Sequence, residues 1–148
     1  DLMIEIEMKA KLSRQLYLSR DDYITIGRWK SKRPTKHYEN NSEDYVKEIS
    51  EIAFRAKNEK IKIEVLTLLN GCNYPLASVI LHFKYPHLYP IIDFRAIWSL
   101  WGENPPTQYK YDYWCKYVEH IRAISKQFSL DLRIVDKALW QYSKENQP

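Results

Sequence analysis

Apolar side chains recur every three or four residues along most of the chain, which is the period of a helix with one buried face. Short breaks rich in Gly, Pro, Asn and Ser separate these stretches, and none of the stretches alternates between apolar and polar residues as a half-buried strand would. The pattern predicts an all-α fold, a compact multi-helix bundle formed by a single domain over residues 1–148. The expected helices cover about residues 3–18, 20–29, 42–56, 60–70, 75–84, 93–101, 114–128 and 130–143.

Several of these helices carry local signals at their ends. Ser19 precedes Asp22 by the spacing of a capping box, and residues 40–42 are all good N-cap types. Gly102, followed by two prolines, suits the end of another helix. The helical period assigns three sets of side chains to buried faces: Met8, Leu12 and Leu16; Tyr45, Ile49, Ile52, Ala53 and Ala56; and Val135, Leu139 and Tyr142.

Composition narrows the classes of function. The chain has 45% hydrophobic residues, enough for a core, and only 3 Gly, which argues against a glycine-rich phosphate loop. Cys72 and Cys115 form no CxxC or Cys/His cluster, so we expect buried free thiols, with no zinc or iron–sulfur site and no cofactor. The formal charge of +4 permits an anionic partner, most commonly nucleic acid. The sequence has no signal peptide pattern and no apolar run of membrane-spanning length, so we expect a cytoplasmic monomer without a membrane partner.

The stretch from Leu68 to Gly102 carries the most information about function. Its pattern predicts a helix, a turn that contains Gly71, a second helix, a loop, and then Asp93 at the head of a further helix. A turn between two short helices points backbone N–H groups outward, and such groups bind a phosphate without reading any base. Gly71 allows close approach or a positive φ, and Asn73 is the next best residue type for a left-handed position.

This stretch resembles the helix-hairpin-helix superfamily of DNA glycosylases, the group of endonuclease III and of the adenine-mismatch and alkyl-base glycosylases. The residues that carry the resemblance are Leu69, Asn70, Gly71, Cys72, Asn73, Ala77, Val79, Ile80, Leu81, Ile92 and Asp93. The separation of Gly71 from Asp93 is similar to that in the endonuclease III group. Residues 132–142 are similar to the C-terminus of an uncharacterised bacterial subgroup built on this domain.

The resemblance implies a monofunctional DNA N-glycosylase of base-excision repair that acts on double-stranded DNA, with Asp93 as its catalytic residue. Members that also cleave the strand place a lysine nucleophile four residues after the first glycine of the turn, where this chain has Pro75. A fixed carboxylate would stabilise the oxocarbenium-like transition state and orient the attacking water. Without the resemblance, an Asp at the head of a helix is an ordinary N-cap, and the two roles are compatible.

Other residues are candidates for contact with DNA. The hairpin contact would use Gly71, Cys72, Asn73 and Tyr74. The candidates for lining the base pocket or wedging the duplex are Tyr74, Tyr85, Tyr89 and Trp29. The densest basic stretch, either a solvated loop or a phosphate contact, comprises Arg28, Lys30, Lys32, Arg33, Lys36 and His37. Arg95 would contact the DNA backbone or pair with a carboxylate, and His82 is expected to be a packing residue.

Two other functions stay open. A helix-hairpin-helix domain that binds DNA without catalysis would keep the hairpin, and the absence of the lysine favours it while the presence of Asp93 opposes it. A helical protein-interaction module would use the hairpin as architecture only. Salt-sensitive DNA binding without base release would indicate the first of these functions, and weak, salt-insensitive binding would indicate the second.

Overall fold

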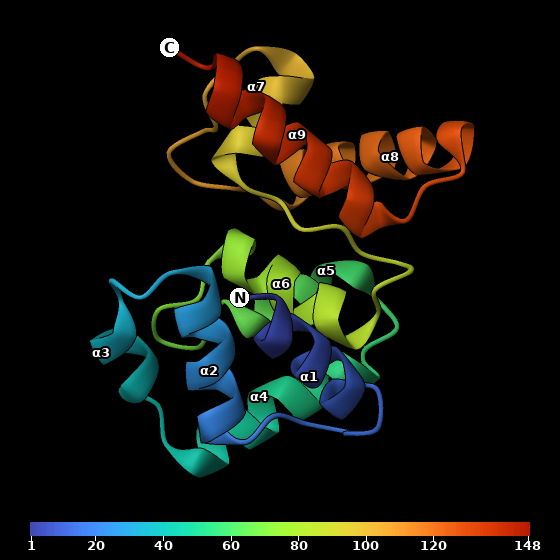
Figure 1. Ribbon diagram of the computed structural model, residues 1–148. Helices are drawn as coiled ribbons and strands as arrows, with labels where there is room; N and C mark the ends of the chain where they lie inside the picture. Colours follow the sequence, from blue (N-terminus) through green and yellow to red (C-terminus); the bar gives the residue numbers. More distant parts are fainter.

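A computed structural model describes residues 1–148 and contains nine helices and no strands (Figure 1). The all-α architecture predicted from the sequence is confirmed. The helices are α1 (Leu2–Leu12), α2 (Arg20–Lys30), α3 (Thr35–Glu39), α4 (Glu43–Arg55), α5 (Glu59–Leu66), α6 (Tyr74–Lys84), α7 (Phe94–Trp101), α8 (Tyr111–Phe128) and α9 (Leu132–Asn146).

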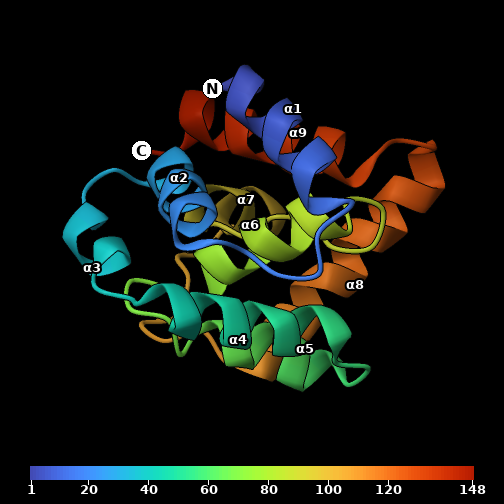
Figure 2. The same cartoon turned by 90° about the horizontal axis from the view of Figure 1, so that it is seen from below.

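The helices form two groups that meet across the middle of the molecule (Figure 1). The larger group contains α1 to α6 and the smaller group contains α7 to α9, and residues 85–93 carry the chain between them. Seen from below, α1 lies alongside α9 (Figure 2), and an ion pair between Glu5 and Arg133 joins these two helices. All nine helices contribute side chains to one hydrophobic core, so the two groups share their interior.

Hydrogen bonds at the helix ends explain where the main elements start and stop. The capping box predicted at Ser19 is present, because the Ser19 hydroxyl accepts from the Asp22 N–H and the Asp22 carboxylate accepts from the Ser19 N–H. The Ser42 hydroxyl caps α4 by accepting from the N–H of Tyr45. Gly102 ends α7 in the left-handed region, at φ 69°, which agrees with the sequence prediction.

The first helix is shorter than predicted. It ends at Leu12, and the side chain of Leu16 is 71% exposed instead of buried. Lys84 of α6 terminates the helix, because its ammonium group donates to the carbonyl of Leu12 at 2.8 Å and also to the carbonyl of Gln15. This capping group comes from a distant part of the chain, so the local pattern around Leu12 gives no sign of it.

Two predicted buried faces are also partly wrong. The covered face of α4 is centred on Ile49 and Ala53, whereas Tyr45 and Ile52 are 39% and 42% exposed. The apolar stripe of α4 is wider than the surface that α5 and α2 cover, so its edges reach solvent. Tyr142, near the end of α9, is 54% exposed, and its ring stacks on that of Trp98 from α7.

His82 lies on α6, the most deeply buried helix, and is a packing residue as predicted. Its side chain is fully buried, and its Nδ1 lies 2.7 Å from the carbonyl oxygen of Tyr89. Its Nε2 has no hydrogen-bond partner. Burial lowers the pKa of His82 to about 4, although the bond to Tyr89 opposes this shift. The imidazole is therefore neutral at physiological pH.

We expect His82 to make the protein less stable in mild acid. The unfolded chain takes up a proton near the ordinary His pKa of 6.5, and the folded chain does so only at about 4, so stability is lost as the pH falls through this window. The full loss is roughly 3 kcal/mol. Urea unfolding of the wild type and of His82→Asn at neutral pH and near pH 4.5 tests this, and the wild type should lose more stability than the variant. The exposed His87 provides the control, because His87→Asn should retain the wild-type loss; equal losses in wild type and His82→Asn would contradict the prediction.

Candidate functional site

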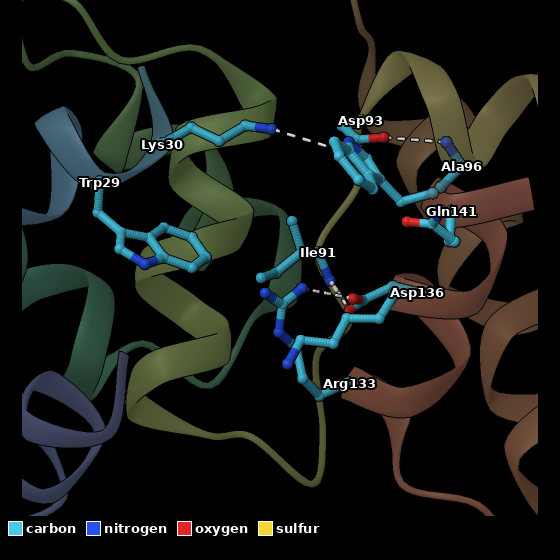
Figure 3. Close-up of a pocket in the computed structure, with 10 residues that line it drawn as sticks. Trp29, Lys30, Ile91, Asp93, Ala96, Arg133, Asp136 and Gln141 are labelled. Carbon is cyan, nitrogen blue, oxygen red and sulfur yellow. Dashed lines mark hydrogen bonds and ion pairs between the residues drawn. The ribbon is translucent and has the colours of Figure 1, made fainter. Parts of the chain in front are cut away.

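A cleft of about 500 Å³ separates the two helix groups. Figure 3 shows Trp29 and Lys30 reaching into it from α2 on one side, with Asp93 and Gln141 on the other. The side chains that line it are Trp29, Lys30, Ile91, Asp93, Ala96, Arg133, Asp136, Lys137, Trp140 and Gln141. Its volume falls within the range of about 300–1,000 Å³ that is typical of small-molecule sites.

Asp93 lies in this cleft and also caps α7. Its Oδ1 accepts a hydrogen bond of 2.9 Å from the backbone N–H of Ala96, which fixes the carboxylate at the helix N-terminus. Its Oδ2 lies 3.6 Å from Nζ of Lys30, and the Asp93 side chain is 14% exposed (Figure 3). One oxygen is therefore held by the helix, while the other faces the cleft and a lysine from α2.

The chain immediately before Asp93 is held by side chains from three helices. The N–H of Ile91 donates to the Asp136 carboxylate at 3.1 Å, and the carbonyl of Ile91 accepts from the Tyr117 hydroxyl at 2.8 Å. The N–H of Ile92 donates to the hydroxyl of Ser78 at 3.0 Å. Residues 91 and 92 lie outside any helix and pair with no strand, so these side chains satisfy their backbone groups. Ser78, Tyr117 and Asp136 therefore fix the segment that leads into Asp93. Sequence reasoning missed all three, because their partners are backbone groups far along the chain.

The inner end of the cleft holds a buried ionic network. Arg133 donates to both oxygens of Glu5, at 3.0 and 3.1 Å, and to Asp136 at 2.7 Å. Burial raises the pKa of Asp136 to about 7, against the opposing effects of Arg133 and the Ile91 N–H. The pKa of Glu5 falls to about 2, because the hydrogen bonds and charges of Arg133 and Lys9 outweigh the effect of burial. The network joins α1 to α9 directly behind the Asp93 segment.

The connection between α5 and α6 forms a tight turn around Gly71, which has φ +85°. Its conformation depends on Asn70: the Asn41 side chain accepts from the Asn70 N–H and donates to the Asn70 carbonyl, and the Tyr23 hydroxyl donates to that carbonyl as well. Asn73 was predicted to be left-handed, and this is wrong, since its φ is −121°. Asn73 instead precedes α6 in an extended conformation, and Gly71 alone provides the reversal of the chain.

Tyr38 of the short helix α3, which was not predicted, is the reason for glycine at two positions. A Cβ on Gly71 would lie 2.7 Å from Cδ1 of Tyr38, and a Cβ on Gly27 would lie 2.7 Å from Cδ2 of the same ring. The ring therefore fills the space between α2 and the turn. Through this contact, the turn is connected to the end of α2 that carries Lys30.

Gly71→Ala is expected to destabilise the fold by about 2–3 kcal/mol, because it adds backbone strain at φ +85° and a clash with Tyr38. Gly102→Ala is the matched control: its φ is +69°, but a Cβ there meets nothing within 4 Å, so it should cost only about 1 kcal/mol. Thermal or urea unfolding of both variants measures the difference. Equal costs would show that the Tyr38 contact is unimportant.

The first turn of α6 leaves several backbone donors free. The N–H groups of Gly71, Asn73, Tyr74 and Leu76 make no hydrogen bond within the protein, and the Asn73 side chain does not cap the helix. Gly71 and Asn73 are exposed, so this end of the helix is open to solvent. A helix N-terminus with free N–H groups attracts anions, phosphate among them.

Tyr109 packs against the first residue of α6. Its ring stacks on that of Tyr74 with a centroid separation of 6.5 Å. Burial, together with the nearby charge of Asp93, raises the pKa of Tyr109 to about 12. Tyr109 therefore contacts the first residue of α6 and lies within the electrostatic influence of the N-cap residue of α7.

The structure brings only some of the residues singled out from the sequence to the cleft. Trp29, Lys30 and Asp93 line it, whereas the candidate pocket residues Tyr85 and Tyr89 do not. Lys30 had been grouped with a basic loop, and it instead faces Asp93 from the last position of α2.

The remaining candidates do not line this cleft. Lys32 and Arg33 are exposed in the connection between α2 and α3. The Cys72 and Tyr74 side chains are buried, which leaves only their backbone for an external ligand. Arg95 makes no ion pair and lies over two aromatic rings, those of Phe94 and Trp140.

Comparisons with protein-family models, with curated proteins and with solved structures find no match to this chain. The structure brings together no group of three or more His, Cys, Asp or Glu side chains that could hold a metal ion. Cys72 and Cys115 are free thiols; Cys72 is buried and Cys115 is half-buried. None of the helices has the length and apolar character needed to cross a membrane.

Proposed function

We propose that this protein is a monofunctional DNA N-glycosylase of base-excision repair. The observation that carries the proposal is the position of Asp93: a helix cap fixes its carboxylate, and its second oxygen faces a cleft of nucleotide-binding size. The resemblance of residues 69–93 to the helix-hairpin-helix glycosylases supports it. The free N–H groups at the start of α6 and the exposed Lys32 and Arg33 support a phosphate-binding surface nearby.

The chemistry follows from a fixed carboxylate beside the sugar. The bond between C1′ and the base nitrogen breaks, and the bonding electrons leave with the base. Positive charge then develops on the sugar, and the Asp93 carboxylate stabilises it. A water molecule attacks C1′ and passes a proton to Asp93, from which the proton reaches solvent or the released base. The cap from Ala96 holds the carboxylate in place, so little reorganisation is needed during the reaction.

The target base would leave the duplex and enter the cleft. Trp29 offers an aromatic surface there, and its indole is held by an edge-on contact with Phe83 and by the Arg133 guanidinium over its face. Polar groups on α9, including Gln141 and the Asp136 carboxylate, face the same space (Figure 3). The exposed Gln141 amide can form hydrogen bonds with the edge of a base, whereas both oxygens of Asp136 already accept from Arg133 and from the Ile91 N–H.

A non-catalytic DNA-binding domain is the second candidate. The Lys30 ammonium group lies 3.6 Å from Asp93 and favours this candidate. It compensates the negative charge of Asp93, which would otherwise stabilise the positive charge of the transition state. In a catalytic complex, the substrate sugar would have to compete with Lys30 for the free oxygen of Asp93. Base release therefore decides between the two candidates.

The test uses labelled duplexes that carry uracil, hypoxanthine, 3-methyladenine, 8-oxoguanine, thymine glycol, or a G·T or A·G mismatch. The products are treated with hot alkali to cleave abasic sites. Strand breaks that need the alkali support the proposal and name the substrate. Breaks without alkali would indicate a lysine nucleophile, for which Lys30 and Lys137 are the cleft lysines to replace. Salt-sensitive DNA binding without breaks on any duplex would favour the second candidate.

A further inference from the structure

The rim of the cleft on the side of α7 and α9 carries exposed aromatic rings. Trp140 is 36% exposed and Phe94 is 48% exposed, and Trp140 also lines the cleft that contains Asp93. Large aromatic side chains usually bury most of their surface in the core, and most of those in this chain do. Trp140 and Phe94 therefore form an aromatic surface that continues from the candidate site onto the outside of the molecule.

Cations surround these rings. The Arg95 guanidinium lies 5.2 Å from the ring centroid of Phe94 and 5.7 Å from that of Trp140, and Nζ of Lys144 lies 5.1 Å from the ring centroid of Trp140. Lys137, one helical turn before Trp140, lines the cleft. These cations give the rim a positive charge and cover part of the ring faces, so a base that stacks there takes the place of a cation, which is then free to pair with a phosphate.

The cations of the rim form no ion pairs with carboxylates. Arg95, Lys137 and Lys144 take part in none of the ion pairs of the chain. Of the two acidic side chains on α9, Glu145 accepts a hydrogen bond from Gln141, and Asp136 is paired with Arg133. A ligand that suits this rim therefore has negative charges and flat apolar faces, spaced closely enough to meet Trp140, Phe94 and the cations together.

We infer that this rim binds unpaired nucleotides, with bases stacked on Trp140 and Phe94 and phosphates near Arg95, Lys137 and Lys144. Stacked rings between cations are how proteins hold single strands, since every base has a face to stack and every nucleotide has a phosphate. A base inside a duplex already stacks on its neighbours and offers no free face. Because the rim leads into the Asp93 cleft, and on the basis of the proposed function, the substrates include bases in single-stranded or locally unpaired DNA.

The test separates stacking from charge by using two labelled strands of about 12 units, a length suited to one binding surface. One strand is oligothymidylate, and the other has the same phosphates with abasic sugar analogues. Fluorescence anisotropy at several salt concentrations measures the Kd of each. The wild type should bind oligothymidylate about tenfold more tightly than the abasic strand.

Three variants identify the residues responsible. Trp140→Ala should lose the preference for oligothymidylate, and Trp140→Phe should retain most of it. Arg95→Gln should weaken binding of both strands and reduce the salt dependence, because it removes a phosphate contact. Tyr17→Ala is the matched control: Tyr17 is 38% exposed with Nζ of Lys47 4.8 Å from its ring centroid, and it does not line the cleft, so its removal should change nothing.

Equal affinity of the wild type for the two strands would overturn the inference, as would an unchanged preference in Trp140→Ala that still melts like the wild type. The base-release assay on duplexes tests the proposed function separately from this inference. Base release without any preference for oligothymidylate would overturn the inference about the rim and leave the proposed function standing. A preference that depends on Trp140, with no base release on duplexes or single strands, would support the rim and contradict the enzyme.

Discussion

Replacing Asp93 with asparagine is expected to lower the rate of base release by about 10²–10³-fold, which is the usual cost of removing a group that stabilises transition-state charge. Asparagine caps helices as well as aspartate does, so the Ala96 bond and the fold should persist. The neutral amide cannot stabilise an oxocarbenium-like sugar or accept a proton from water. Single-turnover assays on the duplex that the wild type processes fastest measure the rate.

Two further variants distinguish the charge of Asp93 from its structural role. Asp93→Ser retains a capping oxygen without a charge, so it should melt like Asp93→Asn and be equally inactive. Lys30→Gln removes the ion pair at 3.6 Å and leaves the carboxylate, so base release should persist. Full activity in Asp93→Asn would show that Asp93 is only a helix cap and would remove the main support for the proposed enzyme.

Arg133→Met is expected to destabilise the protein by about 3–5 kcal/mol at neutral pH, because it leaves two buried carboxyl groups without their shared cation. Glu5 is 5% exposed and Asp136 is 4% exposed, so water cannot easily replace the guanidinium. Methionine has a similar length and keeps much of the packing. Urea unfolding measures the loss, and hydrogen exchange at the Ile91 amide reports whether the segment before Asp93 loosens with it.

The pH dependence of this variant identifies the cause. The pKa of Glu5 in the folded protein is about 2, below its ordinary value of 4.5. The ionised Glu5 therefore adds its full contribution to the folding stability above pH 4.5, and this contribution is lost as the pH falls from 4.5 to about 2. The difference in stability between wild type and Arg133→Met should therefore narrow as the pH falls. Lys9→Met is the control: Lys9 makes one hydrogen bond to Glu5 and none to Asp136, whereas Arg133 bonds both carboxylates, so Lys9→Met should cost less than Arg133→Met. A pH-independent difference would indicate lost packing instead of lost charge compensation.

Much of the helical framework was predictable because its signals are local. The capping box at Ser19, the N-cap at Ser42 and the left-handed Gly102 each depend on residues within one helical turn, and the structure has all three. The same local pattern identified Asp93 as the head of a helix. It failed at Leu16, because the group that ends α1 is Lys84 of α6.

The all-α class, most helix positions and the place of Asp93 at the head of a helix follow from the sequence alone, since each depends on spacing within a single helix or turn. The surroundings of Asp93 depend on contacts between helices. Lys30 meets Asp93 from α2, Asp136 and Tyr117 hold Ile91 from α9 and α8, and Trp140 completes the cleft. These groups lie on different helices, and their contacts depend on how the two helix groups close over a common core, which no local pattern records.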